Sequence, residues 1–176
     1  MSLRSVIVAT LLLGDQYGLQ LHHEIVTRTA RTRPLNVGQI YSTLDRLRAA
    51  GLVTETGRTD DDLTLHGLTP AGLEAARAWS TSPVHPLDWS EMREQILLVS
   101  SLPGEPVGNL VSAYDHEWSA AAASETPDDL GADTALAAAA VTWLRGIDAT
   151  TRRERALDGT RPPRGRRPRS VHLASA

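Results

Sequence analysis

The sequence of 176 residues contains no cysteine. This absence excludes disulfide bonds and cysteine-based zinc sites, and it agrees with a cytoplasmic location, which we expect. Lysine is missing too, since all 18 basic residues are arginine. In a chain this rich in alanine, genome composition explains that bias better than chemistry does. Long hydrophobic runs are also absent, because the apolar start is far shorter than the ~20 residues that span a bilayer. We therefore expect no membrane segment.

Signatures of catalysis are equally scarce. The sequence has no phosphate-binding glycine loop and no Gly-x-Ser-x-Gly motif. His22 and His23 are neighbours and point to different sides of a helix, and the other histidines are scattered without metal-ligand spacing. We predict no catalytic residue, no metal and no cofactor, and we expect that the protein is not an enzyme.

Charge is distributed unevenly along the chain. Residues 1–82 carry eight arginines and eight acidic groups, so they are neutral overall. Residues 83–158 carry five arginines against thirteen acidic groups, and residues 159–176 carry five arginines and no acidic group. A neutral beginning, an acidic middle and a basic end are expected to have different roles.

The neutral part begins with signals for three helices. Apolar residues at 3, 6, 7, 11 and 12 form a helical stripe. We interpret this segment as the first core helix and not as a signal peptide, because no small-x-small cleavage site follows it. A second helix is expected over residues 17–29, before a turn at Pro34. A third is expected from an Asn36 N-cap to about Ala50, with Gly51 at its end.

A β-hairpin and a fourth helix are expected next. Residues 52–58 and 62–68 alternate partly between apolar and polar side chains and are joined by polar turn residues. Thr69 and Pro70 are typical of an N-cap and a first helical residue, so a helix should run to about Ser80. Together these elements predict a winged helix-turn-helix domain over residues 1–82.

The remaining elements are all expected to be helical. After a linker at 80–86, helices are predicted over residues 90–101, 105–124 and 128–156. The last is rich in alanine, which favours helix and close helix packing, and Leu136, Ala137, Ala140 and Leu144 should share its inner face. It is too long to be covered by the chain around it, so a partner chain is the economical explanation. We predict a helical dimerisation and effector region over 83–157 and a disordered basic tail over 158–176.

The third helix carries the residues most suited to a nucleic acid. Ile40, Leu44 and Leu47 follow helical spacing and should face the core. The outward positions are then polar or small, and short hydroxyl and amide groups there can reach base edges or phosphates, while arginine makes bidentate contacts. These positions are Gly38, Gln39, Ser42, Thr43 and Arg46. A polar helix face is often merely solvated, but the preceding helix and the following hairpin favour DNA binding.

Ordered motifs in this segment resemble the PadR-like winged-helix transcriptional regulators. The second helix contains Tyr-Gly-x-x-Leu at residues 17–21, and the third contains Tyr-x-Thr-Leu-x-x-Leu at 41–47. Gly-Leu-Val at 51–53 and Leu-Thr-Pro-Ala-Gly at 68–72 match two further landmarks. The resemblance covers about residues 3–80. It implies a DNA-binding head, with Tyr41 and Thr43 helping to hold the phosphate backbone beside Asn36.

The hairpin departs from the family pattern. The family usually has a basic or aromatic wing, whereas Asp60, Asp61 and Asp62 would repel phosphate here. Arg58 remains as the basic candidate in the wing. Additional phosphate contacts are expected from the arginines just before the third helix, unless these are simply solvated turn residues. They are Arg28, Arg31 and Arg33.

Two features of the C-terminal half allow either a functional role or an ordinary structural one. Aromatic side chains there, which the family resemblance relates to flat aromatic effectors, would line a small-molecule pocket or simply form core and dimer packing. They are Trp89, Tyr114, Trp118 and Trp143. The tail has five arginines in the nine residues 161–169. It would follow DNA phosphates, or it would solubilise the chain or pair with the acidic middle.

We therefore predict a sequence-specific transcriptional regulator, and we favour repression over activation. As a homodimer it would place two recognition helices in successive major grooves of a palindromic operator, and a small aromatic effector would release it. The alternative, motivated by the acidic wing, is a small-molecule- or protein-binding module that kept the winged-helix fold and lost tight DNA binding.

Overall fold

The computed structural model describes residues 2–30, 34–84, 87–104, 107–124, 131–147 and 154–157. In chain order the elements are α1 (Leu3–Thr10), the short 3-10 helix η1 (Leu11–Leu13), α2 (Gly18–Thr29), α3 (Val37–Ala49), β1 (Val53–Arg58), β2 (Thr64–Leu68), α4 (Pro70–Thr81), α5 (Trp89–Val99), α6 (Val107–Ala122) and α7 (Ala132–Arg145). The predicted class, mainly helical with one small β-hairpin, is confirmed.

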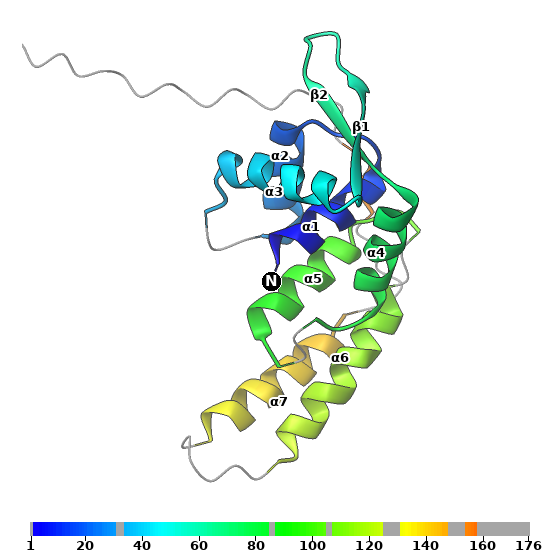
Figure 1. Ribbon diagram of the computed structural model, residues 1–176. Helices are drawn as coiled ribbons and strands as arrows, with labels where there is room; N and C mark the ends of the chain where they lie inside the picture. Colours follow the sequence, from blue (N-terminus) through cyan, green and yellow to red (C-terminus); the bar gives the residue numbers. More distant parts are fainter. Residues whose placement is uncertain are drawn as a thin grey trace, which may run out of the picture.

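The elements form a head and a helical extension. Helices α1 to α4 pack together, and the β1–β2 hairpin projects away from them (Figure 1). Helices α6 and α7 lie side by side at the other end, and α5 packs against α1, α2 and α6. The head therefore has the arrangement of a winged helix-turn-helix, with α2 and α3 as the helix-turn-helix and the hairpin as the wing.

The core of the head follows the predicted helical stripes. Ile7 of α1, Leu21 and Ile25 of α2, and Ile40 and Leu47 of α3 are fully buried. The same cluster of buried side chains continues through Met92 and Ile96 of α5 into Leu110 and Tyr114 of α6. The inner side of α3 is thereby fixed against the rest of the fold, and its outer side is left for other contacts.

The hairpin and α4 are locked to each other where they meet. Strands β1 and β2 are antiparallel, and Val53 pairs with Leu68. The Thr69 hydroxyl donates to the Gly51 carbonyl at 2.6 Å and accepts the Gly72 N–H at 3.0 Å. A Cβ atom on Gly72 would lie 1.9 Å from the Leu52 carbonyl oxygen. The two landmarks 51–53 and 68–72 are thus two sides of one contact, which explains why glycine stands at position 72.

The prediction for the last helix was wrong in length. Helix α7 ends at Arg145, where the Gly146 N–H donates to the carbonyls of Thr142 and Trp143, and residues 154–157 are not helical. The argument that a helix of nearly thirty residues needs a partner chain therefore no longer holds. Ala137, Ala140 and Leu144 face α6 as expected, but Leu136 does not belong to the inner face, because it is 41% exposed.

Two further observations concern the described residues only. No helix among them combines the length and the apolar character that crossing a lipid bilayer requires. Within the same ranges, no three histidine, cysteine or acidic side chains gather as metal ligands would. The prediction for the basic tail falls on residues outside the described part of the chain.

Candidate nucleic-acid interface

The outer face of α3 presents the polar side chains that the sequence placed there. Gln39, Ser42 and Arg46 are exposed, and Tyr41 is 46% exposed. They lie on the side opposite Ile40, Leu44 and Leu47. A helix whose apolar side packs in the core and whose polar side is exposed is suited to entering a DNA major groove.

Thr43 does not belong to this face. Its residue is only 3% exposed, because it follows Ile40 by three residues and precedes Leu44, which places it on the edge of the buried stripe. The expectation that Thr43 lies on the outward face is therefore wrong, and its burial disfavours a DNA contact in this conformation of the head.

The start of α3 is closed by its own cap. The Asn36 Oδ1 accepts the Gly38 N–H at 2.8 Å, and the Gln39 Oε1 accepts the Asn36 N–H at 3.3 Å. This reciprocal pair is a capping box. The Gly38 N–H is thus occupied. Gln39 remains exposed, but its amide oxygen is engaged in the cap.

Two contacts set the position of α3 relative to α2. Tyr41 lies over the first residue of α2, where a Cβ atom on Gly18 would come within 2.6 Å of the Tyr41 ring. The ring of His22 bonds the carbonyl of Leu35 at 2.7 Å, just before the Asn36 cap. The pairing of Tyr-Gly in α2 with Tyr41 in α3 therefore has a steric basis. The role of His22 escaped the sequence analysis, because nothing local links it to a residue 13 positions away.

The two arginines of α3 have different electrostatic surroundings. Arg48 forms ion pairs with Asp45 and with Glu55 of β1. Arg46 lies back along its own helix, and its bonds are to the carbonyl and hydroxyl oxygens of Ser42. No carboxylate in the described ranges pairs with Arg46. It is therefore the cation on this face that a phosphate or a guanine can recruit without breaking an ion pair.

The wing offers little positive charge. The Arg58 guanidinium is bound by the Asp62 carboxylate at 2.7 Å, and both side chains are exposed. Asp60 and Asp61 are exposed beside them. The predicted contact between Arg58 and a phosphate would therefore compete with an existing ion pair at an acidic hairpin tip.

Of the three arginines that were expected to add phosphate contacts, the described residues include Arg28. Arg28 is buried, at 5% exposure, and its guanidinium is used inside the protein, by Glu24 at 2.6 Å and by Ser101 at 2.8 Å. The prediction that Arg28 contacts phosphate is therefore corrected. Arg31 and Arg33 lie outside the described residues.

The four aromatic residues proposed for an effector have different surroundings. Trp89 and Trp143 pack edge to face, with ring centroids 5.2 Å apart. Tyr114 is fully buried and donates its hydroxyl to Gln95 Oε1, and burial raises the pKa of Tyr114 to about 12. The phenol thus stays protonated and acts as a core hydrogen-bond donor.

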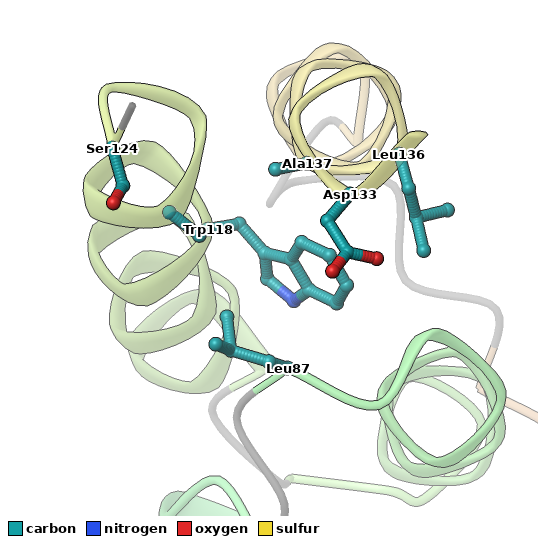
Figure 2. Close-up of a pocket in the computed structure, with 7 residues that line it drawn as sticks. Leu87, Trp118, Ser124, Asp133, Leu136 and Ala137 are labelled. Atoms are coloured by element: carbon teal, nitrogen blue, oxygen red, sulfur yellow. The ribbon is translucent and has the colours of Figure 1, made fainter. Parts of the chain in front are cut away.

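Trp118 alone of the four lines a cavity of about 280 Å³ between α6 and α7. Figure 2 shows its ring projecting from α6 toward α7, with Leu87 on one side and Asp133 and Leu136 near the other. The indole Nε1 of Trp118 is buried and has no hydrogen-bond partner among the described residues. The cavity lining is mixed, because Ser124 and Asp133 stand among apolar side chains.

Known proteins similar to the chain include one family and a solved structure. No curated protein matches the chain significantly. A crystal structure of Bacillus subtilis PadR in complex with operator DNA is similar to the chain at 18% sequence identity, with a TM-score of 0.41, over 81% of this chain and 94% of that chain. The model of the transcriptional regulator PadR-like family matches residues 7–78. The winged helix-turn-helix formed by these residues is therefore similar to the PadR-like family of transcriptional regulators.

Proposed function

We propose that this regulator is a repressor that binds a palindromic operator as a homodimer, with the α3 helix of each protomer in a major groove. Two such helices fit half-sites about one helical turn apart. The observation that carries the proposal is the outer face of α3, where Gln39, Ser42 and Arg46 are exposed while the opposite side is anchored in the core. Tyr41, which is 46% exposed, lies at the edge of the same face.

A gel shift against the promoter of the protein's own gene tests DNA binding, at low and at moderate salt. A discrete complex that survives unlabelled nonspecific DNA supports the proposal. If a folded protein gives no complex even at low salt, the alternative is favoured: a small-molecule- or protein-binding module that kept the fold. The acidic wing, with Arg58 already paired to Asp62, is the observation behind that alternative.

Footprinting across the genome with the purified protein would then define the operator. Reporter expression with and without the regulator gene distinguishes repression from activation.

The dimer is proposed to form through the helical region, over residues 83–157. Support comes from two large apolar side chains next to the α6–α7 pair, since Leu87 is 57% and Leu136 is 41% exposed. Exposed apolar groups of this kind are typical of interfaces when they cluster. In analytical ultracentrifugation, L136E should shift the protein toward monomer, while A138E, at an exposed position two residues further along α7, should not. A dimer unaffected by L136E would place the interface elsewhere.

An effector is proposed to bind the cavity beside Trp118. A flat aromatic molecule with a polar ring atom matches a lining in which Trp118, Leu136 and Ala137 stand beside Ser124 and Asp133. Such a ligand changes operator affinity only if it prefers one arrangement of the two heads. Calorimetric titration with quinoline, which has one ring acceptor, tests the pocket. Binding should be lost in W118L and kept in W89L, whose tryptophan packs on Trp143.

A further inference from the structure

The side-chain amide of Gln39 is oriented by the N-cap of α3. Its Oε1 accepts the Asn36 N–H at 3.3 Å, while the Asn36 Oδ1 accepts the Gly38 N–H at 2.8 Å. A backbone N–H only donates, so the amide atom that faces it is the oxygen. The Gln39 Nε2 is therefore the free end of this exposed amide, and no acceptor among the described residues takes its hydrogens.

The neighbouring polar groups on the outer face of α3 have the same polarity. The Ser42 hydroxyl donates to the Gln39 carbonyl at 3.2 Å and accepts from Arg46 Nη2 at 3.4 Å, so its only hydrogen is used within the helix. The Arg46 guanidinium has donors and no acceptor. What this face offers to a ligand is therefore mainly donors, from the Gln39 amide nitrogen and from Arg46.

The bases differ in what their major-groove edges ask of a glutamine. Guanine presents two acceptors, N7 and O6, whereas adenine presents the N7 acceptor beside the N6 amino donor. A glutamine with both ends free reads adenine, because its oxygen accepts from N6 and its nitrogen donates to N7. With the Gln39 oxygen held by the cap, the adenine amino group would lose water and gain no partner, which is costly. A donor-only amide fits the two adjacent acceptors of guanine.

We propose that Gln39 is a specificity-determining residue that selects guanine over adenine at one position of each half-site, because the capping box leaves its amide only as a donor. The inference rests on the proposed function, since it presupposes that α3 reads an operator. Gln39 lies in the first turn of α3 and is exposed, and recognition helices contact base edges with their N-terminal residues. The cap that starts the helix thus also determines which base edge its first turn accepts.

The test compares the full-length natural protein with Q39E and Q39M. Q39E keeps an oxygen for the Asn36 N–H, since glutamate completes a capping box as glutamine does, but an ionised carboxylate does not donate. Q39M has a similar length and no donor. Thermal melts establish that all three proteins are folded at the temperature of the binding measurements. The probe is a set of duplexes in which each base pair of the footprinted half-site is replaced in turn by the other three.

Base preferences are compared within each protein, because the added charge of Q39E lowers its affinity for every duplex. The natural protein should prefer guanine over adenine at one position by roughly fivefold or more, as expected for a good base contact. Q39M should lose that preference, and Q39E should shift it toward cytosine, whose N4 amino group donates to a carboxylate. At the same position 7-deazaguanine, which lacks the N7 acceptor, should weaken binding by the natural protein and not by Q39M. Inosine, which keeps N7 and O6, should leave binding unchanged.

The contrary outcomes are distinguishable. If the natural protein prefers any base other than guanine at the position that Q39M relaxes, the proposal is wrong, and a preference for adenine would mean that the cap opens in the complex. If both variants keep the base preferences of the natural protein at every position, Gln39 reads no base, while the proposed function stands. If none of the three proteins forms a specific complex with any duplex of the set, the proposed function itself fails.

Discussion

A winged helix offers DNA two surfaces, and here they differ in charge. Helix α3 leaves Arg46 without a carboxylate partner among the described residues and exposes Gln39 and Ser42. The hairpin at residues 53–68 carries one arginine and four carboxylates, and that arginine, Arg58, is bound by Asp62. In the proposed complex, α3 would therefore supply the specificity, and the wing would add little general affinity for phosphate.

Among the predicted changes in DNA binding, the loss of the Arg46 side chain should have the largest effect. We predict that R46A weakens operator binding by about 1–3 kcal/mol and relaxes selectivity at one base position, as expected for loss of a side chain that bonds a base. Fluorescence anisotropy with operator and scrambled DNA measures both. R48A is the matched control, because Arg48 is already bound by Asp45 and Glu55, and it should cost less. Equal selectivity of R46A and the natural protein would contradict the assignment of α3.

Neutralising the wing should act in the opposite direction. We predict that changing Asp60, Asp61 and Asp62 to asparagine tightens binding to operator and to scrambled DNA alike, by about three- to tenfold at low salt, since exposed charges interact by about 1 kcal/mol or less. The gain should fade as salt rises and screening increases. R58Q should weaken nonspecific binding only slightly. Should the triple variant leave binding at low salt unchanged, the wing would lie away from the duplex.

The features that the sequence revealed depend on short-range rules. The Asn36 cap, the Thr69-Pro70 helix start and the inward stripe of α3 all involve partners within four residues of one another. Thr43 was misplaced because it sits at the edge of that stripe, where the width of the packed neighbour decides burial and spacing alone does not.

The features that it did not reveal depend on distant partners. Arg28 looks like a free basic residue before the recognition helix, yet besides Glu24 it has partners that lie 73 and 127 positions away. Helix α7 was overestimated because its alanine-rich pattern favours helix, whereas the structure ends the helix at Arg145. The effector prediction likewise grouped aromatic residues by type, whereas the structure separates the Trp89–Trp143 pair from the cavity at Trp118.

The base of the wing should make stability depend on pH. His66 of β2 is 8% exposed, its Nδ1 has no partner among the described residues, and its backbone pairs with Gln16. Burial lowers the pKa of His66 below its ordinary 6.5, although Glu55 partly offsets this. The unfolded chain therefore binds a proton first as pH falls, so stability is lost from about pH 6.5 downward and the loss ends at the lower folded pKa. Urea unfolding at pH 7.5 and 5 should show a smaller loss for H66Q. An equal loss in both proteins would assign the effect to other groups.

The smallest expected effect concerns the two hydroxyls that follow Tyr41. Ser42 is exposed on the outer face of α3, and Thr43 is buried at 3% exposure. S42A should weaken operator binding by roughly 1 kcal/mol if its hydroxyl bonds DNA directly, whereas T43V keeps the buried shape and should leave affinity unchanged. Affinity is compared at equal folded fraction, which a thermal melt establishes for each variant. A loss of affinity in T43V without a loss of stability would mean that α3 turns about its axis when it meets DNA, and that the inner edge of the helix in the free protein is part of its reading face.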